Sequence, residues 1–196
     1  MKKIIAIVTS AILCFSLVGC KGSNKEKETN TANNNETTTS TVAQKETKVF
    51  SEEKKVATYD NFLKVEVGES YDDTVKELGE PNKLVTEGDT NTYFWTLENG
   101  GSISVIVEDG KIVSMSQGLL TGESTGITME QYNQLQEGMT VEEVQAIAGS
   151  GTLTTEEQMD GYVRSFYSYR NDDDSTAVIT YHDGKLYSKC QNNLDI

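Results

Sequence analysis

Few residues in this 196-residue chain have the types and spacing that catalysis or metal binding requires. The one histidine, His182, stands beside an Asp-Gly pair typical of a hairpin turn, and no nucleophile lies at a spacing that would form a catalytic pair. Asp172, Asp173 and Asp174 form an acidic run, but a calcium loop needs ligands at alternate positions, a central glycine and a distant glutamate. We therefore expect an exposed turn histidine, a solvated acidic turn, no catalytic residue, no metal site and no cofactor.

Cys20 is the residue whose chemistry the sequence indicates most clearly. Two lysines precede an apolar run that extends to about Leu17, which suits the core of a signal peptide and is too short to span a bilayer. The run ends in Leu-Val-Gly-Cys at 17–20, which resembles the bacterial lipoprotein signal. The resemblance implies that residues 1–19 are removed and that Cys20 carries lipid, which anchors the chain to a bacterial membrane outside the cytoplasm. An ordinary secretory signal with an incidental cysteine is the alternative.

The remaining cysteine has no expected intramolecular partner. Cys14 leaves with the signal peptide and Cys20 carries lipid, so the folded part is expected to hold together by packing without disulfides. Cys190 lies in a strand-like run, and we expect it to be a buried small hydrophobe rather than a reactive thiol.

Composition separates a polar tether from an acidic folded part. Residues 20–57 are rich in Asn, Thr, Lys, Glu and Ser, so a lipidated cysteine followed by a disordered tether is expected. A short helix over Val49–Ala57 is the alternative for the end of this segment. Residues 58–196 hold 8 Lys and Arg against 25 Asp and Glu. This charge argues against nucleic acid as a ligand, and it favours a basic partner or cations.

One sequence pattern occurs twice in the acidic part. Residues 62–79 match residues 132–149 when the second segment is shifted by 70 positions. Ser70 and Thr140 are N-cap candidates, followed three residues later by Asp and Glu respectively, so the second helix has the fuller capping box. A glycine ends each helix, and each helix has a short helical segment before it.

Strand patterns follow each helical pair. Asp-Gly and Asn-Gly turns separate the runs, which is typical of antiparallel hairpins. We expect an α+β fold of two tandem units, 58–122 and 123–196, each a helix-loop-helix packed on one face of an antiparallel β-meander. The expected strands are 92–97, 102–107 and 111–117 in the first unit, and 162–169, 176–181 and 185–191 in the second.

Alternation assigns the two faces of each meander. Ile103, Val105 and Val107 share one face, and Ala177, Ile179 and Tyr181 match them in the second unit, so these residues are expected to pack against the helices. Aromatic residues and a methionine are assigned to the opposite face, which we expect to bind another protein. The alternative is that the two units pack these faces together. The candidate binding residues are Trp95, Met115, Tyr167, Tyr169 and Tyr187.

The doubled Gly-x-[Ser/Thr] helix with its trailing meander resembles the β-lactamase inhibitory protein (BLIP) family. More distantly it is similar to small envelope lipoproteins of the SmpA/OmlA type. The resemblance covers about residues 58–196 and is closest over 132–151 and from Asp183 onward. It implies a non-enzymatic inhibitor whose two units form a sheet surface that grips a class A β-lactamase, with hairpin loops entering the active site.

Three features depart from that family pattern. Leu153 stands where a second-unit cysteine is expected, and no disulfide pair exists. The first inserting loop presents an Asp in the inhibitor, but residues 98–101 here are Glu-Asn-Gly-Gly; the second presents an aromatic, but residues 171–174 are Asn-Asp-Asp-Asp. We therefore expect a lipid-anchored module that binds an unidentified protein. A structural envelope-assembly lipoprotein and a genuine β-lactamase inhibitor are the alternatives.

Overall fold

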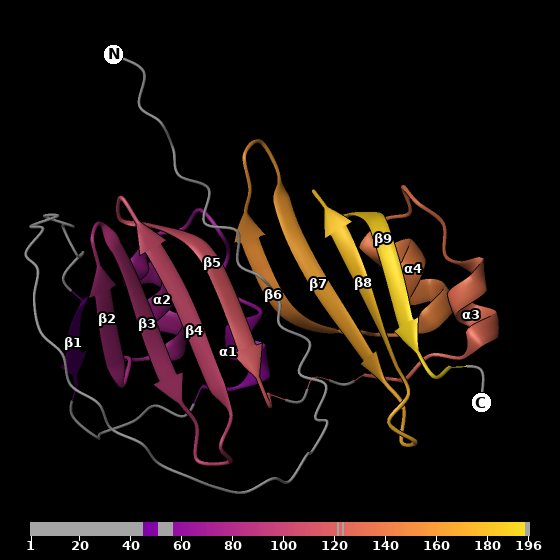
Figure 1. Cartoon of the computed structure of the whole chain (residues 1–196), viewed down its shortest axis with the longest axis horizontal. Helices are drawn as coiled ribbons and strands as arrows, with labels where there is room; N and C mark the ends of the chain where they lie inside the picture. Colours follow the sequence, from indigo (N-terminus) through magenta and orange to yellow (C-terminus); the bar gives the residue numbers. More distant parts are fainter. Residues whose placement is uncertain (1–44, 51–56, 121, 123, 195–196) are drawn as a thin grey trace, which may run out of the picture. The chain divides into compact units, whose positions relative to one another are not determined.

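The computed structural model describes residues 45–50, 57–120, 122 and 124–194, and over these residues it has nine strands in one antiparallel sheet (Figure 1). The strands lie in sequence order, so each is hydrogen-bonded to the next. The strands are β1 (Lys45–Val49), β2 (Lys83–Glu87), β3 (Thr90–Thr96), β4 (Ser102–Glu108), β5 (Lys111–Gly118), β6 (Thr152–Gln158), β7 (Val163–Arg170), β8 (Thr176–His182) and β9 (Lys185–Asn192). The α+β class and the tandem units are confirmed.

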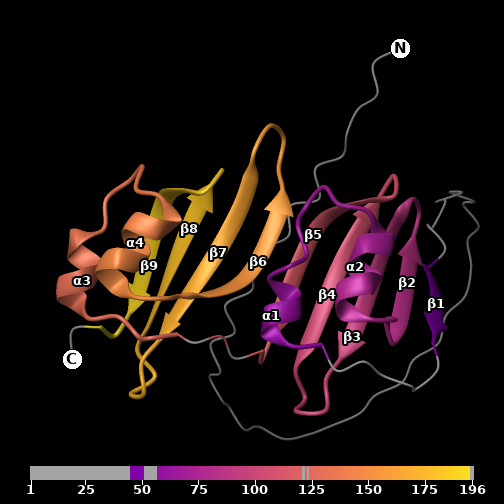
Figure 2. The ribbon, with the colours of Figure 1, turned by 180° about the vertical axis from the view of Figure 1, so that it is seen from behind.

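Each unit carries its helical pair on one face of its strands. Figure 2 places α1 (Tyr59–Phe62) and α2 (Tyr71–Leu78) in front of the first unit's strands, and α3 (Met129–Gln134) and α4 (Val141–Ala148) in front of the second's. We call this the helix side and the opposite side the open face.

The capping prediction is confirmed: Thr140 and the Glu that follows three residues later form a reciprocal box at α4. No helix among the described residues is long and apolar enough to cross a membrane.

A pair of backbone hydrogen bonds fastens each helical pair to the last strand of its unit. In the first unit, the Gly68 amide donates to Ile112 O at 2.8 Å, and the Ile112 amide donates to Glu69 O at 2.9 Å. In the second, the Gly138 amide donates to Leu186 O at 2.8 Å and the Leu186 amide donates to Met139 O at 2.7 Å. These clips occupy the outer edges of β5 and β9 near their first residues, so the duplication extends to single hydrogen bonds.

Two apolar clusters fill the helix side, one under each helical pair. Ile103, Val105 and Val107 are buried in the first cluster, as predicted. Their counterparts in the second cluster, Ala177, Ile179 and Tyr181, are buried too. Burial of these faces against the helices is the main favourable contribution to folding, at about 25 cal/mol per Å² of apolar surface.

The two units join edge to edge through β5 and β6. Ser114, Met115 and Ser116 pair with residues 155–157. Leu153 of the second unit belongs to the first unit's core cluster, and its amide donates to the Tyr59 hydroxyl at 2.7 Å. The open faces therefore continue along one sheet and are not packed against each other. The alternative in which the units bury these faces together is wrong.

A β-bulge explains why the prediction for Met115 is wrong. Strict alternation places Met115 on the face opposite Ile112, but the ladder between β4 and β5 shifts register between Ile106 and Val107. The extra residue lets both Ile112 and Met115 point to the helix side, where each is 1% exposed.

Part of the predicted tether belongs to the sheet. Residues 45–49 form the edge strand β1, in which Lys45 pairs with Glu87 and Val49 with Lys83. The prediction of disorder is therefore wrong for these five residues, and the alternative helix does not begin at Val49. Two lysines, a glutamate and a threonine among its five residues are compatible with an exposed edge strand, which needs little apolar surface. Ala57, the last residue of the expected tether, is also described and is buried in the first core cluster, so the prediction of disorder is wrong there too. Cys20, the signal peptide, residues 21–44 and residues 51–56 lie outside the described residues.

Candidate protein-binding surface

The structure leaves only one of the five predicted binding residues well exposed on the open face. Tyr187 is 56% exposed, whereas Trp95 is 2% exposed and Met115 and Tyr169 are each 1% exposed. Trp95 pairs with Ile103 and Tyr169 with Ala177, so both lie in the core rows of the sheet. The predicted surface position of Trp95, Met115 and Tyr169 is therefore wrong.

Tyr167 also lies on the helix side, since it pairs with Ile179 in the core row. It packs against both core clusters and helps to line a cavity of about 290 Å³ together with Tyr59 and Leu63. Burial raises the pKa of Tyr167 to about 12. This tyrosine contributes to the junction of the two units rather than to the open face.

Three aromatic rings form a stack where Tyr187 lies. His182 stacks on the Tyr187 ring at 3.8 Å between centroids and contacts the Tyr162 ring on its other side at 4.3 Å. His182 is the last residue of β8, and its ring is partly buried by the two tyrosines. The prediction of an exposed turn histidine is therefore wrong. We call Tyr162, His182 and Tyr187 the three-ring stack.

A charged pair and a phenylalanine continue this surface across the sheet. Arg164 pairs with His182 across β7 and β8, and its guanidinium donates to Glu157 Oε1 at 2.7–2.8 Å. The same guanidinium lies 5.4 Å from the centre of the Phe166 ring. Stacked rings and an ion pair with two contacts to one carboxylate oxygen hold their positions without a partner present, which reduces the entropy lost when a partner binds.

The open face of the first unit has a different character. Phe94, with Lys83 Nζ 5.5 Å from the centre of its ring, is the large aromatic side chain of that face. Across the neighbouring strands it is followed by Ser104 and Ser116, whose hydroxyls are 2.8 Å apart. Small hydroxyl side chains therefore cover the centre of the sheet, and the aromatic surface lies in the second unit.

Sequence reasoning missed Phe94, Tyr162, Phe166 and His182. The signal was present for the two phenylalanines, because each adjoins an aromatic residue and alternation must place one ring of each pair on each face. To decide which ring of each pair lies on the open face, the cross-strand partner of each residue must be known. The pattern within one strand does not give that partner. The stacking of His182 depends on three residues from different strands.

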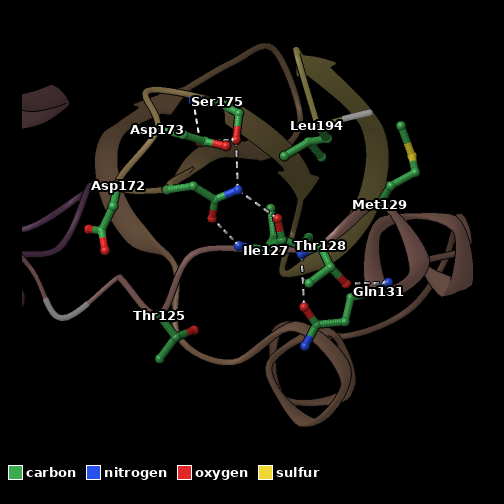
Figure 3. A pocket seen from close by; sticks show the side chains of 10 residues that line it. Thr125, Ile127, Thr128, Met129, Gln131, Asp172, Asp173, Ser175 and Leu194 are labelled. Atoms are coloured by element: carbon green, nitrogen blue, oxygen red, sulfur yellow. Dashed lines mark hydrogen bonds between the residues drawn. The ribbon is translucent and has the colours of Figure 1, made fainter. Parts of the chain in front are cut away.

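The acidic turn forms a structural clamp beside a cavity of about 430 Å³ (Figure 3). Asn171 Nδ2 donates to Ile127 O at 2.9 Å and to Ser175 Oγ at 2.8 Å, and Asn171 Oδ1 accepts from the Ile127 amide at 2.8 Å. Hydrogen bonds from the side chain and amide of Ser175 lower the pKa of Asp173. Among the described residues, no group of three or more His, Cys, Asp or Glu side chains is arranged to hold a metal ion.

Cys190 is exposed, so the prediction of a buried cysteine is wrong. It pairs with Val178 on the open face of β9, the last strand of the sheet, and so has a strand on one side only. No disulfide involves it among the described residues.

Comparison with known proteins agrees with this architecture. The family model described as "Beta-lactamase inhibitor (BLIP)" matches residues 58–162 and 142–196, which together span the acidic folded part. The chain belongs to the BLIP family. Proteins of this family are non-enzymatic inhibitors that act on a protein partner. The two overlapping matches agree with the tandem units of the structure.

Two solved structures are similar to this member of the BLIP family. A Streptococcus mutans protein described as a "putative beta-lactamase inhibitor protein" has 18% identity and a TM-score of 0.56, covering 68% of this chain and 94% of its own. An extracellular Bacillus anthracis protein containing an SCP domain has 10% identity and a TM-score of 0.31, covering 74% of this chain and 51% of its own. The first likeness supports the fold. No curated protein matches the sequence.

Proposed function

We propose that this BLIP-family chain is a lipid-anchored, extracytoplasmic protein-binding module. The partner contacts the open face of the second unit, where the three-ring stack, Arg164 and Phe166 lie. The lipoprotein-type signal ending at Cys20 supports the anchor and the compartment. Family membership supports a protein as the ligand.

The single observation that carries the proposal is the three-ring stack on the open face. An exposed tyrosine that rests on a stacked histidine presents a rigid, apolar surface with a polar tip, which is the type of side chain that dominates protein interfaces. The described residues cover this surface with no helix or strand, since all the helices lie on the other side (Figures 1 and 2). The net acidity of residues 58–196 favours a basic partner.

A binding experiment with matched variants tests the proposal. The full chain, purified in detergent, is used to capture exported proteins, and the affinity for the recovered protein is measured. Tyr187→Ala and Phe166→Ala remove side chains of the proposed surface, and we expect each to weaken binding roughly tenfold or more. Leu63→Ala is the control, because Leu63 is 46% exposed on the helix side.

Cooperative thermal unfolding well above the assay temperature in all three variants would exclude a loss of fold as the cause. Equal binding by Tyr187→Ala, Phe166→Ala and Leu63→Ala would contradict the proposal. Recovery of a large membrane assembly by every variant would instead favour the structural envelope role.

Family membership also favours β-lactamase inhibition as a second candidate function. The tips that would enter an active site differ from the family pattern. The β3–β4 turn is closed by its own Asn99, whose Oδ1 accepts from the Gly101 amide at 2.9 Å. The β7–β8 turn is held by Asn171, which bonds to Ile127 rather than projecting a free side chain. An inhibition assay against a panel of class A β-lactamases tests this candidate, and we expect micromolar binding or none.

A further inference from the structure

The outer edge of β9 is the second-unit counterpart of the edge of β5 to which β6 is hydrogen-bonded. Lys111 and Lys185 occupy equivalent positions, since each pairs with the helix-capping residue of its own unit, Ser70 and Thr140. Both strands then bulge at the same place: Ile106/Val107 on the β4–β5 ladder corresponds to Thr180/Tyr181 on the β8–β9 ladder. The correspondence between β5 and β9 therefore runs residue by residue.

Two segments, residues 68–70 and strand β6, pair with this edge of β5. The clip from residues 68–70 occupies it near Ile112, and β6 occupies it at Ser114, Met115 and Ser116. In β9 the corresponding clip occupies the edge near Leu186. The equivalents of the β6-binding residues are 188–190, and no described residue pairs with β9 there on its outer side. An unpaired edge in this position is a template for another strand.

Cys190 lies in the middle of that free stretch. It is the structural counterpart of Ser116, which pairs with Thr155 across the β5–β6 junction. Its side chain is exposed, so a strand added to β9 brings a residue directly opposite the thiol. We propose that two copies of this chain pair through β9 in antiparallel orientation, with Cys190 opposite Cys190, and that a disulfide between these two residues links them.

The geometry of an antiparallel pair suits this bond. A two-fold axis through the Cys190 pair sets residue 188 opposite 192 and residue 189 opposite 191 of the second copy. Residues directly opposite in antiparallel strands have Cα atoms about 4.5–5.5 Å apart, within the range that a disulfide spans. Both Cys190 side chains then lie on the same face of the joined sheet, which a cross-strand disulfide requires.

The charges along β9 favour a second copy despite the acidity of the folded part. β9 contains Lys185 and Lys189 and no carboxylate, so two β9 strands bring no carboxylates of their own together. In the proposed register Lys189 lies opposite Gln191, and no like charges are opposed between residues 188 and 192. Five residue pairs would form, against the three that join β5 to β6.

The redox step balances with a small-molecule disulfide as oxidant. Two Cys190 thiols exchange with it in turn: one S–S bond forms between the copies, the oxidant's S–S bond breaks, and the two thiol protons and two electrons leave with it as two small thiols. The covalent bond depends on the extracytoplasmic location proposed above, because the cytosol keeps thiols reduced. The pairing of the strands does not depend on it.

Crosslinking of the full chain in detergent with oxidised glutathione tests the thiol. We expect a dimer on non-reducing gels that dithiothreitol converts to monomer. Cys190→Ser leaves the rest of the chain unchanged and is expected to abolish the crosslink. A covalent dimer that forms equally well on non-reducing gels in the Cys190→Ser chain would overturn the proposal.

The register is tested with cysteines moved by two residues in each direction. In the Cys190→Ser background, Ser188→Cys mixed with Asn192→Cys is expected to crosslink, while either variant alone is expected to stay monomeric on the gel. Crosslinking by Ser188→Cys alone to the same extent as the mixture would contradict the antiparallel register.

Pairing without the disulfide is tested by sedimentation of the Cys190→Ser chain. We expect reversible dimers, and we expect Ser188→Asp combined with Asn192→Asp to raise the dimer Kd roughly tenfold, since these carboxylates face each other twice across the axis. A monomer at all concentrations would overturn the pairing. Failure of these dimerisation tests is distinguishable from failure of the proposed binding function. The binding test measures the affinity for a captured partner protein, and it uses the variants Tyr187→Ala and Phe166→Ala instead.

Discussion

The two units of this chain keep the same internal hydrogen bonds and differ on the surfaces that they present. In the first unit, Trp95 Nε1 donates to Gly79 O at the end of α2, at 2.9 Å. In the second, the Tyr169 hydroxyl donates to Gly149 O at the end of α4, at 3.1 Å. Different side chains therefore satisfy the same helix-terminal carbonyl from the same position in the sheet.

The open faces show no such agreement. Where the second unit has His182 and Arg164, the first has Glu108 and Thr90, and the Thr90 hydroxyl donates to Glu108 Oε1 at 3.1 Å. The place of Tyr187 in the three-ring stack is taken by Val113. The comparison separates two kinds of constraint. Contacts between helices and sheet are fixed by the fold and recur, whereas open-face side chains are free of that constraint and are available for binding.

The largest effects are expected where the units agree. Trp95→Ala and Tyr169→Ala each remove a fully buried aromatic, and we expect each to lower the free energy of unfolding by about 3–5 kcal/mol. Tyr169→Phe removes only the hydroxyl and is expected to cost about 1 kcal/mol. Chemical denaturation followed by circular dichroism measures these differences.

Tyr187→Ala provides the matched surface comparison. Its ring is exposed and loses only the stacking contact with His182, so we expect a cost of about 0.5–1.5 kcal/mol. A cost for Trp95→Ala no larger than that for Tyr187→Ala would contradict the assignment of Trp95 to the core.

The helix caps allow a finer comparison of the two units. At α4, Thr140 Oγ1 accepts from the Glu143 amide, and Glu143 Oε2 accepts from the Thr140 amide at 2.8 Å. At α2, Ser70 Oγ accepts from the Asp73 amide at 3.3 Å but donates to the Asp73 carboxylate instead of completing the box. We expect Thr140→Ala and Ser70→Ala to cost about 1 kcal/mol each.

The two helix caps differ in the role of the side chain three residues after the N-cap, which is Glu143 in α4 and Asp73 in α2. Glu143→Ala exposes the Thr140 amide, whereas Asp73→Ala leaves the Ser70 amide as it was, so the first change is expected to cost more. Thermal unfolding measures both, with the exposed Glu137→Ala as control. A larger loss for Asp73→Ala than for Glu143→Ala would show that the salt bridge of Asp73 to Lys76 matters more than the box.

Local sequence signals predicted the repeated helices and the last three strands of each unit, because caps, Asp-Gly turns and alternation act over a few residues. They also placed Ile103 and Ile179 in the core correctly. They missed the strands β2 and β6. The face of Met115 was wrong because a bulge depends on the partner strand. The strand at 45–49 was missed because its polar residues gain their order only from pairing with β2. Predicting the open face required the full register of nine strands.

The smallest change in stability is expected at one position of the core rows where the two units differ. Glu156 pairs with Ser165 in the second unit, where the first unit places Thr86 opposite Asn91. Burial raises the pKa of Glu156, with the nearby Glu66 carboxylate adding to the rise and a hydrogen bond from the Val67 backbone opposing it.

A raised carboxyl pKa makes the folded chain hold its proton more tightly than the unfolded chain does. Stability from this group is therefore complete below the ordinary pKa of 4.5 and is lost as the pH rises through the folded value. Glu156→Gln removes the cost of the buried charge, so we expect a higher Tm than wild type at pH 7.5 and no gain at pH 4. The exposed Glu87→Gln is the control. A gain of equal size at both pH values would point to packing rather than charge, and a Tm lowered at pH 7.5 alone would mean that the Glu156 carboxylate is stabilised by its surroundings at the junction between the units.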